Sequence, residues 1–185
     1  MNILEIILVS ISLAMDAFAV SLCKGMSFSN SKYNNGLVVG LYFGLFQAIM
    51  PIIGYMIGNR FHDLIISFDH WISFFLLAFI GIKMIKDAIL NENNINNRID
   101  YKTMLPLAIA TSIDALVIGV TMSFLDVNII LSISFIGIIT LILSFVGVLI
   151  GNKVGEHLGI KSQIFGGFIL IVIGLKILFE HLKLI

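Results

Sequence analysis

Long apolar stretches alternate with short polar segments along the whole chain. Each stretch is close to the length of about 20 residues that a helix needs to cross the hydrocarbon core of a bilayer. The apolar residues form continuous runs and lack the period-two alternation of membrane β-barrel strands. The pattern predicts an all-α, polytopic membrane protein with six transmembrane helices, over residues 3–23, 36–58, 69–89, 103–124, 128–150 and 163–182.

Most of the basic residues lie in or next to the polar segments, and more of them lie on one side of the predicted membrane than on the other. The first, third and fifth connections, together with Lys86 at the edge of the third stretch, carry seven Lys or Arg residues, whereas the opposite side carries Arg60 and Lys183. Positive charge collects on the cytoplasmic side of membrane proteins. We therefore expect both termini to face outward. The third connection, Asn91–Asp100, should be a cytoplasmic loop, because its polar residues show no apolar period.

The two halves of the chain repeat each other. Asp16-Ala17 recurs 98 positions later as Asp114-Ala115, and from the second stretch onward the offset is 93 positions. At that offset the recurring pairs are Gly44 with Gly137, Gly54 with Gly147, Gly58-Asn59 with Gly151-Asn152, and Gly81-Ile82-Lys83 with Gly174-Leu175-Lys176. The sequence predicts a three-helix repeat over residues 1–90 and a second over residues 103–185, within one membrane transport domain, 1–185. Because three spans end on the opposite side from where they began, the second copy should be inverted.

Composition supports lipid as the solvent. Of the 185 residues, 59% are hydrophobic and 12% charged, whereas soluble domains carry roughly a quarter charged residues. The 11 Lys and Arg residues are matched by 11 Asp and Glu residues, which excludes a basic nucleic-acid-binding surface. The lone cysteine, Cys23, excludes an internal disulfide and a thiolate metal cluster. Membrane lipid is an expected partner and nucleic acid is not, while the oligomeric state stays open.

Asp16 and Asp114 are the most informative polar residues, because each lies near the middle of an apolar stretch. A carboxylate at that depth costs about 2.5–3.5 kcal/mol on insertion scales. Inverted repeats should bring the first and fourth helices together, and with them the two carboxylates. Two such anions repel unless a cation or a proton lies between them. The pair predicts a metal site that can exchange protons. The alternative is that each Asp only bonds a neighbouring side chain.

Several hydroxyl residues near the carboxylates are further candidates for the ion pathway. Ser12 lies one helical turn before Asp16, and Thr111 and Ser112 lie within one turn of Asp114. Oxygen ligands of this kind suit hard cations such as Mg²⁺, Ca²⁺ or Mn²⁺. The alternative is that these hydroxyls only bond the backbone of their own helices.

Gln47 is a candidate for a different reason. It stands four residues before Pro51, which has no N–H to bond the carbonyl of Gln47 in a helix. A side-chain amide and a free backbone oxygen would form part of a ligand set, although a simple packing kink is equally compatible. Thr140, the repeat equivalent of Gln47, completes the candidates, and Ser144 stands where the second half would need a proline.

Glycines recur at four-residue spacing in the second and fifth stretches and predict close helix packing. Asn59 and Asn152 follow glycines where these stretches end. The sequence predicts that both are helix C-caps.

Several motifs also resemble those of a known family. Met15-Asp16-Ala17-Phe18-Ala19-Val20-Ser21, Phe43-Gly44 leading to Pro51, His70-Trp71-Ile72 and Ala110-Thr111-Ser112-Ile113-Asp114-Ala115 occur in this order. The set resembles the MntP family of manganese exporters, in the LysE superfamily of small exporters with six spans. The resemblance implies Mn²⁺ efflux across the cytoplasmic (inner) membrane and a role in manganese homeostasis. It also assigns the family's intramembrane acidic residues to Asp16 and Asp114.

These observations favour a secondary exporter of manganese(II), driven by proton exchange. Mn²⁺ is then the transported substrate, and no cofactor or enzyme activity is expected. One alternative is an exporter of another divalent cation or of a small solute of the same superfamily. Another is an intramembrane aspartyl-type enzyme, because that chemistry also uses two close carboxylates.

Overall fold

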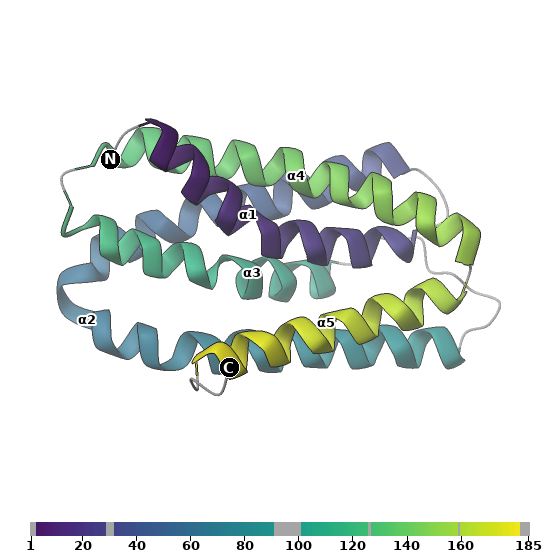
Figure 1. The fold of residues 1–185 in the computed structure, drawn as a ribbon. Coiled ribbons are helices and arrows are strands. Elements are labelled where there is room, and N and C mark those ends of the chain that lie inside the picture. Colours follow the sequence, from purple (N-terminus) through teal and green to yellow (C-terminus); the bar gives the residue numbers. More distant parts are fainter. Residues whose placement is uncertain (1–2, 29–31, 91–100, 126, 159, 182–185) are drawn as a thin grey trace.

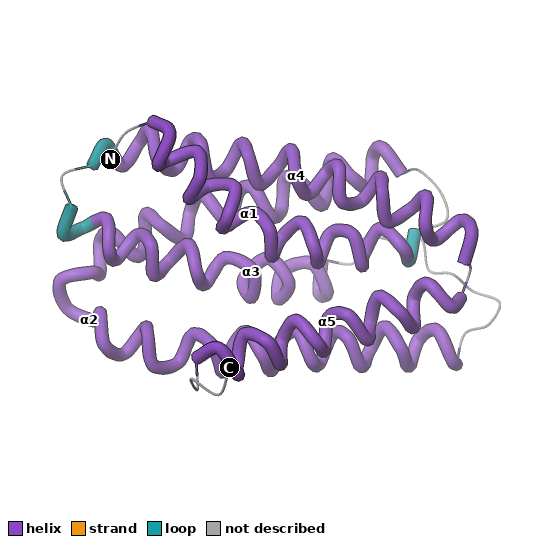
Figure 2. Tube along the Cα trace, in the orientation of Figure 1, coloured by secondary structure: helices purple, strands orange, loops and turns teal. Residues whose placement is uncertain are grey.

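The computed structural model describes residues 3–28, 32–90, 101–125, 127–158 and 160–181, in which every regular element is a helix. The helices, in chain order, are α1 (Ile3–Met26), α2 (Lys32–Leu90), α3 (Tyr101–Met122), α4 (Ile129–Leu158) and α5 (Ile160–His181). They lie along one common direction (Figure 1) and leave little of the described chain in loops (Figure 2). The expected all-α fold is confirmed, while the predicted loop Asn91–Asp100 lies outside the described residues.

Among the described residues, four helical segments are long and apolar enough to cross a bilayer: Ile3–Met26, Tyr33–Gly58, Lys102–Met122 and Ile129–Gly155. A shorter apolar segment, Ile164–Ile173, lies in α5. Large apolar side chains stand on the outside of the bundle, among them Met56 at 78% exposed and Ile130 at 73%. Exposed apolar surface on this scale matches lipid and not water. The chain is a multi-pass membrane protein.

Helix α2 differs from the sequence prediction. A polar connection is predicted between residues 58 and 69, yet α2 stays helical from Lys32 to Leu90. The segment contains neither Gly nor Pro, the residues that most often break a helix. Figure 1 shows α2 reversing direction, so that its C-terminal part lies along α5 and runs opposite to it. One helical segment therefore covers both predicted stretches, 36–58 and 69–89.

The predicted C-caps are wrong, because Asn59 lies inside α2 and Asn152 lies inside α4. The Asn152 side chain is 1% exposed, and its Nδ2 donates to the carbonyl oxygen of Phe28, just beyond the end of α1. Buried amide groups need a hydrogen-bond partner, and a neighbouring segment supplies it here. Asn152 thus ties the end of α1 to α4.

The glycine stripes are packing surfaces, as the sequence predicts. Along α2 and α4, Gly36 faces Phe145, Gly40 faces Leu141 and Gly44 faces both Leu141 and Gly137. The residue numbers rise on one helix while they fall on the other. The first part of α2 and α4 are therefore antiparallel.

The contacts of α4 with α1 run in the opposite sense. Gly147 packs on Phe18 and Gly151 packs on Leu22, so the numbers rise together and these two helices are parallel. In the same way, Gly54 of α2 packs on Leu116 of α3. Farther along, Gly58 lies against Val120, so α2 and α3 are also parallel there. Small residues let the backbones approach this closely.

Candidate functional site

The candidate site is centred on two carboxylates, one in α1 and one in α3. Asp16 and Asp114 lie in the interior of these helices, and both side chains are half-buried in the isolated chain. The two interact electrostatically. The amide N–H of Ala115 donates to Asp114 Oδ1 at 2.7 Å. The fold therefore brings within electrostatic reach the two carboxylates that the repeat pairs.

Gln47 of α2 joins the two carboxylate-bearing helices. Its side chain is fully buried, and its Nε2 donates to the backbone oxygen of Leu13 in α1 at 3.1 Å. The same side chain is hydrogen-bonded to Asp114 in α3. The Gln47 Oε1 atom has no hydrogen-bond partner in the protein. One amide thus positions Asp114 and still offers a free acceptor oxygen.

Pro51 lies inside α2 and is buried, as the sequence requires for a free carbonyl at Gln47. Gly119 of α3 packs directly on the Pro51 backbone. The absence of a side chain at Gly119 therefore allows α3 to approach α2 closely at the proline.

The predicted hydroxyl candidates differ in their burial and in their hydrogen bonding. Thr111 donates to the carbonyl oxygen of Leu107 at 3.0 Å, and Ser112 donates to that of Ala108 at 2.6 Å. Both hydroxyls are therefore satisfied by their own helix, as the alternative interpretation expects. Ser12 lies on the exposed side of α1. Thr140 is fully buried, and its Oγ1 has no partner.

Two further residues were not predicted from the sequence. The hydroxyls of Ser21 in α1 and Ser144 in α4 are buried and have no hydrogen-bond partner. A sequence signal for Ser144 exists, because it occupies the repeat position of Pro51. Ser21 likewise occupies the repeat position of Gly119. A search for polar residues whose repeat equivalents are not polar would have identified both Ser21 and Ser144.

The chemistry of this centre is that of oxygen ligands. Among the described residues, no group of three or more His, Cys, Asp and Glu side chains could hold a metal ion. A cation between Asp16 and Asp114 would therefore have two carboxylates and neutral oxygens such as Gln47 Oε1. Hard divalent cations accept such oxygen ligands and complete their coordination with water.

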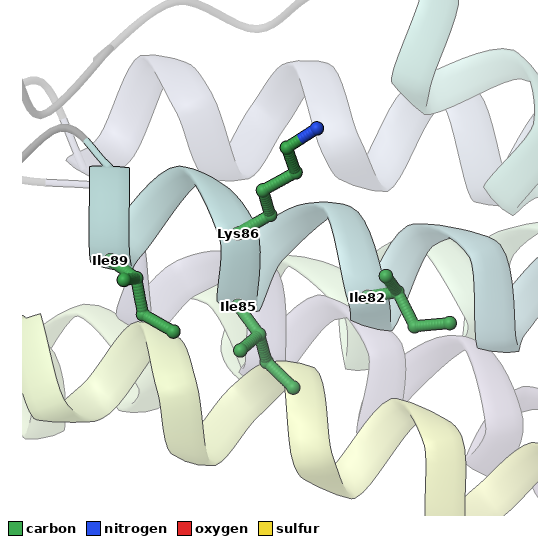
Figure 3. Close-up of a pocket in the computed structure, with 4 residues that line it drawn as sticks. All are labelled: Ile82, Ile85, Lys86 and Ile89. Carbon is green, nitrogen blue, oxygen red and sulfur yellow. The ribbon is translucent and has the colours of Figure 1, made fainter.

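A pocket elsewhere in the bundle does not offer such ligands. Figure 3 shows a pocket of about 370 Å³ on the C-terminal part of α2, lined by Ile82, Ile85, Lys86 and Ile89. Its lining is apolar apart from a cationic side chain. Neither group is a ligand for a metal cation. The described lining residues therefore offer no ligand set for a second cation.

Comparisons with known proteins identify the family of the chain. The family model described as "Mntp: Putative manganese efflux pump" matches residues 30–178. A Campylobacter jejuni protein with the same description is 54% identical over 184 residues, which cover 98% of each chain. Similar relatives occur in Acetivibrio thermocellus, 49% identical over 100% of this chain and 94% of the relative, and in Desulfitobacterium hafniense, 48% identical over 98% and 97%. No solved structure matches the chain. The chain belongs to the MntP family.

Proposed function

We propose that this protein is a secondary exporter that carries Mn²⁺ out across the cytoplasmic membrane in exchange for protons. The relatives described as manganese efflux pumps supply the substrate and the direction. The observation that carries the mechanism is the electrostatic interaction between Asp16 and Asp114, which are both half-buried in an apolar bundle. Mn²⁺ is the cargo in this mechanism, and no enzymatic step is involved.

We further infer that the chain has six spans, arranged as two inverted three-helix repeats over 1–90 and 103–185. The contacts near Gly44 support this. A Cβ built on Gly44 would lie 2.9 Å from the carbonyl oxygen of Gly137, and one built on Gly137 would lie 3.2 Å from that of Gly44. Gly44 also faces Leu141 while Gly137 faces Ala48, another pair at the offset of 93. Reciprocal contacts of equivalent residues are expected where a two-fold axis relates the repeats.

The contacts of α1 and α3 support the same symmetry. Gly54 packs on Leu116, and its repeat equivalent Gly147 packs on Phe18, which is the equivalent of Leu116. Because α2 and α4 are antiparallel there, and each runs parallel to its partner, α1 and α3 run in opposite directions. Opposite directions of equivalent helices are the signature of inversion.

The carboxylate pair then explains both binding and release. With a divalent cation between Asp16 and Asp114, their mutual repulsion becomes attraction to the metal in a low-dielectric interior. Gln47 holds Asp114 in place and offers its Oε1 as a neutral ligand. When the cation leaves, protons neutralise the two carboxylates. The protein can then return to the state that accepts Mn²⁺ without holding two uncompensated charges in the bilayer core.

Asp16→Asn and Asp114→Asn test the centre, because each keeps the shape and removes the charge. We expect each variant to export Mn²⁺ at least about ten-fold more slowly, since interactions with a charged group are worth about 1.5–3 kcal/mol. The measurements are export from preloaded cells, Mn²⁺ tolerance, and the amount of protein in the membrane. Glu5→Gln, an exposed carboxylate in the first turn of α1, is the matched control and should export normally. Normal export by both Asp variants would contradict the proposal.

Inside-out vesicles test the coupling separately. If protons are exchanged for Mn²⁺, an acidic interior should accelerate Mn²⁺ uptake and a protonophore should abolish this acceleration. Mn²⁺ uptake that does not depend on the pH gradient would contradict proton exchange, but it would not contradict Mn²⁺ export.

A further inference from the structure

Three hydroxyl groups in the described part of the chain are buried without a hydrogen-bond partner. In the described part of the chain, the side-chain atoms that are buried without a hydrogen-bond partner are Gln47 Oε1 and the hydroxyl oxygens of Ser21, Thr140 and Ser144. All four residues are 0% exposed. Leaving a buried polar atom unpaired is unfavourable, so such atoms commonly mark a site for water, an ion or a ligand. We call Ser21, Thr140 and Ser144 the hydroxyl cluster.

The helix itself does not force these hydroxyls to be unpaired. Ser10 of α1 donates to the carbonyl oxygen of Ile6 at 2.7 Å, and Ser132 of α4 donates to that of Asn128 at 3.1 Å. Every helical Ser or Thr has this option, one turn back along its own backbone. The hydroxyl cluster sits on the same two helices and does not use it. Its oxygens therefore remain available to something other than the protein backbone.

The cluster lies in one interface, between α1 and α4. Thr140 and Ser144 are four residues apart and share a face of α4, and Gly147 follows on that face one turn later. A Cβ built on Gly147 would lie 3.1 Å from the Cβ of Ser21. The hydroxyls thus line the seam where α1, which also carries Asp16, packs on α4.

The equivalent seam in the other half is different. There, the repeat positions of Ser21 and Ser144 are Gly119 and Pro51, whose backbones are in direct contact. The repeat position of Thr140 is Gln47, which is already bonded to Leu13 and Asp114. Both seams contain close backbone contacts, but the α2–α3 seam has no hydroxyl at these positions, whereas the α1–α4 seam has three hydroxyls without a hydrogen-bond partner. The two halves therefore differ in polarity at these positions.

We propose that the hydroxyl cluster is the inward-facing branch of the cation pathway, along which water and a partly hydrated divalent cation pass to the carboxylate pair. This inference rests on the proposed function and on the orientation that puts the end of α1 in the cytoplasm. Ser21 lies between Asp16 and that end, so the branch leads from the cytoplasm toward the carboxylates. Neutral hydroxyls replace part of the hydration of a hard cation without trapping it. An exporter needs such a route on its cytoplasmic side.

Cysteine accessibility tests the branch without relying on transport. Cys23 is the only cysteine and is replaced first by Ala, and then Ser21→Cys and Ser144→Cys are introduced one at a time. Ser10→Cys and Ser132→Cys are the matched controls, since both are buried on the same helices but bonded to the backbone. A small cationic methanethiosulfonate reagent should modify the branch thiols at least about ten-fold faster, because only a hydrated thiol forms the reactive thiolate. MnCl₂ should slow this modification.

Removal of the hydroxyls tests what the branch does for transport. In proteoliposomes, Thr140→Val and Ser144→Ala should raise the KM for Mn²⁺ by about ten-fold with a smaller change in kcat, and Thr140→Ser should restore the wild-type KM. The melting temperature should stay unchanged or rise, because an unpaired buried hydroxyl has been removed. A purely structural hydroxyl would instead lower the melting temperature and leave KM unchanged. Ser132→Ala is the control for an ordinary helical hydroxyl.

The outcomes separate this inference from the proposed function. If the wild-type protein moves Mn²⁺ but the thiols at positions 21 and 144 react no faster than the controls, the branch is wrong and the exporter stands. Fast labelling without protection by MnCl₂ also overturns the branch as a cation route. If the wild-type protein moves no Mn²⁺ in either assay, the proposed function fails, and labelling protected by MnCl₂ would still support cation binding at this seam.

Discussion

At the scale of single residues, the decisive feature is how each polar group inside the bundle is satisfied. Thr111 and Ser112 resemble ion ligands in sequence, because they lie three and two residues before Asp114, yet both donate to their own helix. Thr140 and Ser144 stand among long apolar residues and have no partner. The sequence cannot distinguish these two cases, since a helical hydroxyl can rotate toward its backbone or away from it. Only the packing around it decides.

Gln47 gives the residue-scale prediction. Gln47→Leu removes the hydrogen bonds to Leu13 and Asp114, and we expect a loss of about 1–3 kcal/mol in the free energy of unfolding because the carboxylate loses its buried donor. Thermal unfolding in detergent measures the change, and Mn²⁺ export should fall with it.

A double-mutant cycle provides the control for this prediction. Because Gln47 and Asp114 contact each other, combining Gln47→Leu with Asp114→Asn should cost less stability than the sum of the two single changes. Strict additivity would show that the amide does not act through Asp114.

At the scale of helices, glycine spacing and helix breakers carry most of the predictive information. The repeated glycines predicted close packing, and the structure has Gly44 against Gly137 and Gly147 against Phe18. The apolar stretches predicted the bounds of α1, α3 and α5 within a few residues, whereas α2 joins two predicted stretches and α4 continues to Leu158, beyond the predicted end at residue 150. The C-cap predictions were wrong because the helices continue past Asn59 and Asn152. The hydrogen-bond partner of the Asn152 side chain is the backbone oxygen of Phe28, which is far away in sequence. Long-range partners of this kind are invisible to local patterns.

Gly44→Ala tests the helix packing. The new Cβ would lie 2.9 Å from the backbone oxygen of Gly137, so α2 and α4 must move apart at this contact. We expect a loss of about 1–3 kcal/mol in stability, the usual cost of overpacking, and reduced Mn²⁺ export. Melting temperature and export from preloaded cells are the measurements.

Gly36→Ala is the matched control on the same helix. Its Cβ would meet only the ring of Phe145, at 3.0 Å, and a side chain can rotate away where a backbone cannot. The effect at Gly36 should therefore be clearly smaller. Equal effects at both positions would mean that the close approach of Gly44 and Gly137 has no special importance.

At the scale of the whole molecule, charge and symmetry set the orientation of the bundle in the membrane. Lys86, Lys102, Lys153 and Lys161 are all exposed on the described surface and belong to the connections that the sequence places in the cytoplasm. Figure 1 shows that α1 and α4 end on the same side of the molecule, the side where α5 begins. Basic residues gathered on one side fix the topology of a membrane protein.

The orientation is tested at Asn94, in the third connection. In the Cys23→Ala background, Asn94→Cys should react with a membrane-impermeant thiol reagent only after intact cells are permeabilised, because seven of the nine basic residues in the connections and tails lie on that side. A cysteine added after Lys183, on the opposite side, is the control and should react in intact cells. Reversed labelling of the two would place the α1–α4 seam and its hydroxyls on the outer side. The hydroxyl branch would then be an exit from the carboxylate pair and not the route by which the cation arrives.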